Sequence, residues 1–283
     1  MYVSPKELCE LYRQACDVDV QAFKPGNVSV YADGHDMTVA DFRLSAEVSA
    51  APLCNPEYCL GEKIYYAVKA TREAVGCNTN LGIILLCAPL IQSISYKSSV
   101  LTLRQAVCKV IIESTIDDAD WVFKAISLAS PGGLGQSDEQ DVNQKASVTL
   151  LEAMKIASFK DLIALQYLNG YEDIFNFAVI RYNGASNRLN DRNWAATSVY
   201  AEMLSQYPDS HIERKYGNQY TEWVATKMAQ LSEELLKTDN PEQLKPMLYA
   251  LDQELKLYDV NPGTTADMIV ATVLTTFLED LNQ

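Results

Sequence analysis

The stretch NTNLGIILLCAPL, residues 78–90, decides how this chain of 283 residues is expected to fold. From Leu81 to Leu90 it carries no charged side chain, yet this run is about half as long as the roughly 20 residues that cross a membrane. We therefore expect a helix buried in a protein core, surrounded by other helices and bent at Pro89. The polar residues 78–80 come directly before it and are suited to cap its N-terminus.

The rest of the chain repeats the helical pattern on both sides of this stretch. Leu103, Val107 and Val110 keep the i, i+4, i+7 spacing of one apolar helix face, and strand-like alternation is scarce. We predict an all-α fold, a single-domain multi-helix orthogonal bundle that covers residues 1–283. Side chains that commonly begin helices mark the expected starts. These are Ser4, Thr38, Leu60, Asp117, Ser158 (paired with Asp161) and Thr264 (paired with Asp267).

The composition is that of a globular protein with a strongly acidic balance of charge. Hydrophobic residues make up 48% of the chain, and the formal net charge is -14 at pH 7. Such a chain repels nucleic acid unless it has a strong basic patch, and the tightest basic pair is Arg214-Lys215. We expect no nucleic-acid or membrane partner. Seven cysteines without zinc-site spacing, and no signal-peptide pattern, predict a cytoplasmic protein.

Polar residues gather in five loops between the predicted helices. In the first, residues 24–37, Lys24 is suited to a phosphate, and His35 and Asp36 are suited to metal binding or proton transfer. The second, residues 76–80, stands at a helix N-terminus, whose free N–H groups suit anions. Both also have a simpler interpretation as a turn and a helix cap, which is preferred for the second loop taken alone.

The third loop, residues 130–142, is rich in glycine and acidic residues. Its GGLG segment at 132–135 superficially resembles a phosphate loop. It lacks the preceding strand, the spacing and the Gly-Lys ending of the dinucleotide-binding and P-loop motifs, so we reject both. A lid or a substrate loop that includes Asp141 is the functional interpretation left open.

The fourth and fifth loops read DSHIERK at 209–215 and NPGTTAD at 261–267. The chain has only two histidines, His35 and His211, and both stand beside carboxylates, so each is suited to act as an acid, a base or a ligand. A solvated helix end explains the fourth loop equally well. Helix capping alone explains the fifth, with Asp267 in the first turn facing the contents of the loop.

Taken together and in order, these loops resemble the ATP:dephospho-CoA triphosphoribosyltransferase family, the triphosphoribosyl-dephospho-CoA synthases. The matching strings are KPGNVS at 24–29, HDM at 35–37, NTNLG at 78–82, DSHIERK at 209–215 and NPGTTAD at 261–267. The resemblance implies an all-helical enzyme with ATP as a substrate and a CoA-like acceptor. In that reaction the 2'-hydroxyl of 3'-dephospho-CoA attacks the ribose C1' of ATP, adenine leaves, and the triphosphate stays attached.

Two features depart from the family pattern. The synthases usually have NTHKG where this chain has NTNLG, and the glycine-rich loop with Asp141 also differs. Both features resemble the family branch of methanogens and methylotrophic bacteria, which is associated with one-carbon metabolism. The alternatives are a nucleotide-dependent transferase with a pterin-like substrate, in the biosynthesis of a one-carbon carrier such as tetrahydromethanopterin, or a nucleotide-binding protein without turnover. A homodimer is also considered.

The resemblance implies a site that neutralises a triphosphate, places a carboxylate near C1' or the attacking hydroxyl, and donates a hydrogen bond to the departing adenine. We expect these loops to converge on one cavity walled by helices. The expected catalytic residues are His35, Asp36, Asp209 and His211, and the expected Mg²⁺ ligands are Asp36, Asp209 and Asp267. The expected substrate-binding residues are Lys24, Asn27, Ser29, Glu62, Asn78, Thr79, Asn80, Asp141, Arg214, Lys215, Asn261 and Thr264.

Overall fold

A computed structural model describes residues 3–34, 37–96, 101–131 and 141–281. These ranges contain fourteen α-helices, three short 3₁₀ or π turns and no strand, which confirms the all-α prediction. The helices are α1 (Pro5–Gln21), α2 (Val39–Leu53), α3 (Leu60–Val75), α4 (Leu81–Ser93), α5 (Leu103–Ile112), α6 (Ile116–Ala129), α7 (Leu150–Ala157), α8 (Leu162–Asn169), α9 (Val179–Leu189), α10 (Arg192–Gln206), α11 (Ser210–Tyr216), α12 (Thr221–Lys237), α13 (Lys245–Leu257) and α14 (Gly263–Asp280).

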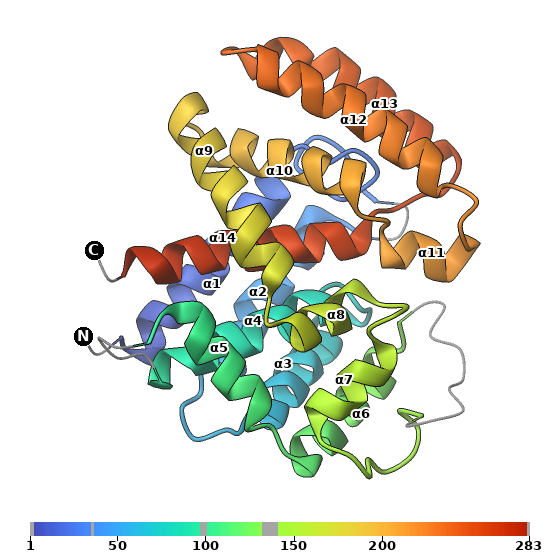
Figure 1. The fold of residues 1–283 in the computed structure, drawn as a ribbon. Helices are drawn as coiled ribbons and strands as arrows, with labels where there is room; N and C mark the ends of the chain where they lie inside the picture. Colours follow the sequence, from blue (N-terminus) through green and yellow to red (C-terminus); the bar gives the residue numbers. More distant parts are fainter. Residues whose placement is uncertain (1–2, 35–36, 97–100, 132–140, 282–283) are drawn as a thin grey trace.

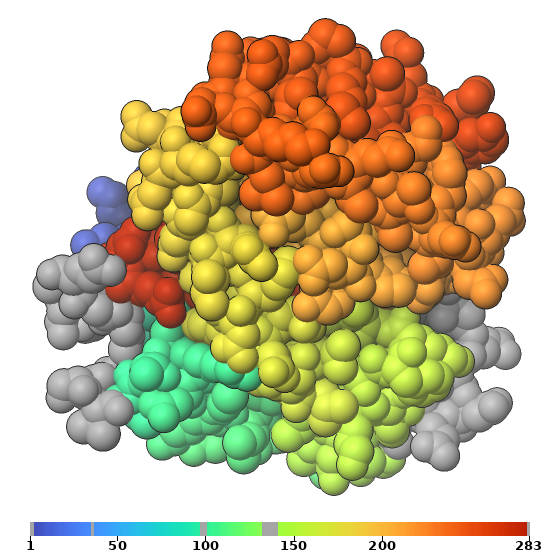
Figure 2. All heavy atoms as spheres, turned by 45° about the horizontal axis from the view of Figure 1, so that its top comes forward, coloured from blue at the N-terminus to red at the C-terminus, as the bar shows by residue number. Residues whose placement is uncertain are grey.

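The α14 helix forms the centre of the fold. It packs against α1, α4, α8, α9, α10 and α11, and the ribbon shows it between an upper group with α12 and α13 and a lower group with α3 to α8 (Figure 1). Every residue from Met268 to Leu278 is buried. Only a small red patch of this helix reaches the surface seen in Figure 2.

The expected buried helix at residues 81–90 is α4. All its residues from Leu81 to Ile91 are buried, and the helix continues through Pro89 to Ser93. The Tyr167 and Tyr171 hydroxyls donate to the Leu85 and Leu86 carbonyls at 2.7 and 2.9 Å. No helix in the described ranges is long and apolar enough to cross a membrane.

Local sequence explains most of the helix starts. Ser4 and Thr38 form capping boxes as expected, and α3 has the predicted bounds. One expected start differs by a single residue, because Thr115 caps α6 and the helix begins at Ile116 instead of Asp117. Another expected start was wrong. Ser158 follows the last residue of α7, and Asp161 caps α8 because its carboxylate reaches the free N–H groups of the first turn.

Candidate functional site

The first turns of four helices, α4, α8, α11 and α14, lie against one another. A Cβ added to Gly82 of α4 would stand 2.0 Å from Asp267 Oδ2 of α14 and 2.7 Å from Ile163 Cδ1 of α8. At the start of α8, the Leu162 backbone N–H donates to Ser210 Oγ of α11 at 3.2 Å. The N-terminus of a helix carries a positive partial charge, so the convergence of four of them favours an anion.

Asp267 lies at this convergence, and the residue as a whole is partly exposed. Burial of its carboxyl group raises its pKa well above the ordinary value, and the carboxylates of Asp19 and Asp209 add to the increase. The cations Lys24 and Arg214 oppose it. Within the described ranges the Asp267 oxygens make no hydrogen bond or ion pair. Asp267 is therefore a carboxyl group that has no partner among the described residues and whose negative form is disfavoured by burial and by neighbouring carboxylates.

The first and fifth loops are joined by a chain of buried polar contacts. Lys24 is fully buried, and its Nζ donates to Asp19 Oδ1 at 2.5 Å and to Asn27 Oδ1 at 3.0 Å. Asn27 Nδ2 donates in turn to Asn261 Oδ1 at 2.9 Å. Burial is the main cause that raises the pKa of Asp19, and Lys24 opposes it. Lys24 thus contributes its charge from behind the surface rather than from an open position.

Asp209 caps two helices at once. Its Oδ1 accepts from the backbone N–H groups of His211 and Ile212, at 2.9 and 3.1 Å, at the start of α11. Its Oδ2 accepts from the backbone N–H and the hydroxyl of Thr265, at 2.7 and 2.8 Å, in the first turn of α14. A carboxylate has about four acceptor positions, and all are used here. We infer that Asp209 positions the two helices, in place of the metal-binding and catalytic roles expected from the sequence.

The start of α14 differs from the expected capping box. The helix begins at Gly263, and Thr264 Oγ1 accepts from Ser210 Oγ at 3.0 Å instead of capping its own helix. The capping group comes from Asp209, which is distant in sequence, so no local motif marks it. Thr264 therefore connects α14 to α11, and its hydroxyl is buried.

Two neighbouring residues of α11 contact different parts of the molecule. Arg214 donates from an Nη atom to Asp161 Oδ2 at 2.7 Å. Its Nε is buried and has no hydrogen-bond partner among the described residues. Lys215 is paired with Asp259 and is more exposed. Of the two, Arg214 acts electrostatically on Asp267.

His211 lies beside the start of α14. A Cβ added to Gly263 would stand 3.1 Å from His211 Nδ1. Burial is the main cause that lowers the pKa of His211, with Arg214 and Lys215 adding to the decrease, and Asp209 opposes it. The imidazole is therefore neutral at pH 7 and able to accept a proton.

The NTN segment before α4 is held by α2. Thr79 Oγ1 and Ser45 Oγ are 2.5 Å apart, and Asn80 Nδ2 donates to Ser49 Oγ at 3.3 Å. Asn78 Oδ1 accepts from the α4 backbone at 3.2 Å, as a capping side chain does. The contacts of Thr79 and Asn80 are internal, and both residues are buried.

Two predicted substrate-binding residues lie away from Asp267. Glu62 is in the first turn of α3 and accepts from the Cys59 backbone at 2.9 Å, whereas Asn78 follows the other end of this helix. The 16 residues of α3 span about 24 Å. Asp141 forms a turn with Asn143 beside a hollow of about 760 Å³ lined by α6.

The three remaining predicted site residues belong to the first loop. Ser29 is buried, and its Oγ accepts from the Tyr31 backbone at 3.4 Å, so its hydroxyl is used within its own loop. His35 and Asp36 lie outside the described residues.

The described residues contain no group of three or more His, Cys, Asp or Glu side chains arranged around a metal. Asp209, one of the predicted ligands, uses its oxygens to cap helices. The Asp267 oxygens have no partner among the described residues, and Mg²⁺ needs only one or two carboxylates when substrate phosphates complete its coordination. The residues present therefore fit a magnesium ion that arrives with a nucleotide better than a resident one.

Sequence reasoning missed several residues that support the site. Asp19 lies on a buried helix face that is otherwise composed of apolar, tyrosine and cysteine side chains, and this contrast was a usable signal. Ser49 shares the buried face of α2 with Ser45. Tyr200 donates to the Pro25 carbonyl at 2.8 Å, and Asp252 accepts from the Gly26 backbone at 2.9 Å. These two come from α10 and α13, and nothing in the local sequence connects them to the first loop.

Comparison with known proteins shows the family to which the chain belongs. The family model described as ATP:dephospho-CoA triphosphoribosyl transferase matches residues 5–283. The chain belongs to this family. It is therefore a transferase whose family uses ATP and dephospho-CoA. No curated protein sequence gives a significant match.

A solved structure of a candidate triphosphoribosyl-dephospho-CoA synthase from Archaeoglobus fulgidus has the same fold. The two chains are 24% identical and superpose with a TM-score of 0.64. The match covers 83% of this chain and 97% of the other. The helical arrangement described above is thus shared across a large distance in sequence.

Proposed function

We propose that this chain transfers the triphosphoribosyl group of ATP to the 2'-hydroxyl of 3'-dephospho-CoA and releases adenine. Family membership supports the reaction, and one structural observation carries the assignment of the site. Four helix N-termini converge beside Asp267, a carboxyl group without a partner among the described residues. This combination offers positive dipole ends to a triphosphate and a negative group to an electron-poor sugar carbon.

The triphosphate meets two kinds of positive group in this site. The positive dipole ends of the converging helices attract phosphate oxygens, although side chains such as Asp209 and Asp161 already accept from several first-turn N–H groups. Arg214 adds a guanidinium group whose Nε–H is unused within the described residues. The charge of the buried Lys24 adds to the local positive potential without direct contact. Asp267 would hold Mg²⁺, which would supply further neutralisation of the phosphates.

The raised pKa of Asp267 explains how the site favours the transition state. Burial, followed by the carboxylates of Asp19 and Asp209, makes a negative charge on Asp267 unfavourable in the free protein. Loss of adenine from ribose produces positive charge at C1', which relieves this repulsion only as the reaction proceeds. The negative charge on Asp267, which is unfavourable in the free protein, therefore stabilises the positive charge at C1' in the transition state.

His211 is our candidate for the group that accepts the proton of the attacking 2'-hydroxyl. Its lowered pKa keeps it neutral at the pH of the cytoplasm, where we expect the reaction to take place. Substitution of His211 by Asn should lower kcat and remove the acidic limb of the pH–rate profile. A variant that keeps this limb would assign the proton transfer to another group.

The decisive experiment incubates the full chain with ATP, Mg²⁺ and 3'-dephospho-CoA. Chromatography follows free adenine, and mass spectrometry identifies the acceptor that has gained a triphosphoribosyl group. We expect adenine and product in equal amounts, neither of them when the acceptor is omitted, and a large loss with Asp267→Asn. ATP binding without adenine release would contradict the proposal and favour a nucleotide-binding protein without turnover. Pterin-like acceptors in the same assay test the other alternative.

A further inference from the structure

Two cysteines meet at the seam between α1 and α2, defined here as the contact line of these helices. Cys9 lies in the second turn of α1, and Cys54 is the residue that follows α2. The Cys9 thiol and the Cys54 backbone N–H both donate to the Ala50 carbonyl, at 3.3 and 3.0 Å. The Cys54 side chain is also the group with the largest effect on the Cys9 thiol. Two cysteines far apart in sequence thus meet at one backbone carbonyl.

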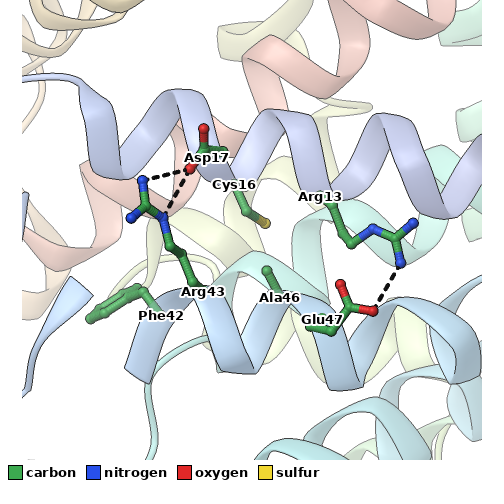
Figure 3. Close-up of a pocket in the computed structure, with 7 residues that line it drawn as sticks. All are labelled: Arg13, Cys16, Asp17, Phe42, Arg43, Ala46 and Glu47. Atoms are coloured by element: carbon green, nitrogen blue, oxygen red, sulfur yellow. Dashed lines mark hydrogen bonds and ion pairs between the residues drawn. The ribbon is translucent and has the colours of Figure 1, made fainter. Parts of the chain in front are cut away.

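The charges along the seam favour a thiolate at Cys9. Arg13 lies one helical turn further along α1 and forms an ion pair with Glu47 across the seam, at 3.2 Å (Figure 3). The hydrogen bond from Cys54, followed by the charge of Arg13, lowers the pKa of Cys9 to about 7, against the effects of burial and Glu47. Cys9 is only partly buried, so small reagents have access to it.

The neighbouring thiols lack this environment. Cys16 faces the small hollow shown in Figure 3, and burial raises its pKa far above the ordinary value. Cys59 is more exposed than Cys9, but loss of water around its sulfur raises its pKa to about 12. Hydrogen bonding to Cys9, followed by burial, raises the pKa of Cys54, so Cys54 keeps its proton and acts as the donor.

We propose that Cys9 and Cys54 form a redox-active thiol pair, which hydroperoxides convert to a disulfide that joins α1 to the end of α2. The Cys9 thiolate attacks one peroxide oxygen, an S–O bond forms, the O–O bond breaks, and hydroxide or alkoxide leaves. The Cys54 sulfur then attacks the Cys9 sulfur, the S–O bond breaks, and water leaves with the Cys54 proton. The two thiols lose two electrons, which reduce the peroxide.

The test treats the full-length wild-type chain with a small excess of hydrogen peroxide near pH 7. We expect a loss of about 2 Da, the mass of two hydrogens, and a proteolytic fragment that contains Cys9 linked to Cys54. A thiol reductant should restore the original mass. This readout on the wild-type chain does not depend on whether any variant folds. Oxidation that leaves Cys9 and Cys54 unlinked would overturn the proposal.

Three variants separate the roles of the thiols. Cys54→Ser should stop the reaction at a sulfenic acid on Cys9, which a dimedone reagent traps. Cys9→Ser should remove both the disulfide and the trapped product. Cys59→Ser is the control, because it removes the more exposed thiol and should oxidise like the wild type. Limited alkylation at pH 7 should modify Cys9 before Cys59. If Cys59 is modified first, the exposure of each thiol, and not the groups around Cys9, determines its reactivity, and the proposal is wrong.

Discussion

Gly82 and Asp267 form the tightest contact of the candidate site. The absence of a side chain at Gly82 lets the Asp267 carboxylate stand against the first turn of α4. A glycine inside a helix costs about 1 kcal/mol relative to alanine, so its presence here needs a reason, and this contact supplies one.

Substitution of Gly82 by Ala should therefore destabilise the protein although alanine favours helices. The new Cβ would stand 2.0 Å from Asp267 Oδ2 and 2.7 Å from Ile163 Cδ1, and overpacking of this kind costs roughly 1–3 kcal/mol. Transfer activity should fall with displacement of the carboxylate. Gly184→Ala is the matched control, since its Cβ meets nothing within 4 Å and should stabilise α9. Equal unfolding midpoints for the two variants would contradict this explanation.

The Asp267→Asn variant should be more stable than the wild type but less active. Folding raises the pKa of Asp267, so the folded chain takes up a proton that the unfolded chain has lost above about pH 4. Stability of the wild type therefore falls as pH rises from that value towards the folded pKa, and the neutral amide avoids this loss.

The measurement for Asp267→Asn is denaturant unfolding between pH 4 and pH 8, together with the transfer assay. We expect the variant to be more stable than the wild type at pH 7, with the gap closing towards pH 4. Activity should fall by roughly 100-fold or more, as when a charge-stabilising group is removed. A variant less stable than the wild type at pH 7 would show that Asp267 is paired when the site is empty.

At the scale of helices, the single carboxylate of Asp209 caps both α11 and α14. One side chain satisfies the first turns of both α11 and α14, which come from distant parts of the sequence. The orientation of α11, and with it of His211 and Arg214, is therefore fixed relative to α14 by a single carboxylate.

Asp209→Ala should cost about twice as much stability as loss of an ordinary cap. One cap contributes about 1 kcal/mol, so we expect a decrease of roughly 2 kcal/mol in the free energy of unfolding. Asp191→Ala is the control, because Asp191 caps only α10, through the backbone N–H groups of Asn193 and Trp194. Urea unfolding compares the two, and equal losses would show that the second cap contributes nothing.

The caps supplied by Asp209 also show which helix starts can be predicted from the sequence. Capping boxes at Ser4 and Thr38 involve residues three apart, so their helix starts are visible in the sequence. The start of α14 depends on Asp209, and a capping motif at Thr264 was therefore the wrong local explanation. A helix start can be predicted only where the group that caps it is close in sequence.

For the whole molecule, the acidic charge opposes the approach of a triphosphate. The formal net charge is -14, whereas the positive groups of the site act only over short distances. Raising the salt concentration from about 10 to 150 mM should therefore accelerate ATP association, since screening weakens long-range repulsion. Stopped-flow binding with fixed Mg²⁺ measures this rate. A rate that falls with salt would show that a local positive field steers the nucleotide.

Only part of the site was predictable, because the sequence does not show how far apart the candidate residues lie in the fold. Polar loops beside helix ends indicated which segments converge, and contacts from Asn27 to Asn261 and from Gly82 to Asp267 agree with that expectation. Glu62 was a poor choice because it starts a helix whose other end leads to the site. Loop composition identifies candidates, but helix length and direction decide which of them meet.

The central place of α14 has a consequence for synthesis on the ribosome. The helices that enclose it, among them α1 and α4, emerge long before it does. Until then their apolar faces have no permanent cover, and the nascent chain resembles the aggregation-prone intermediates that chaperones protect. Assembly of the candidate site around Asp267 thus coincides with closure of the core, and a partly translated chain has neither.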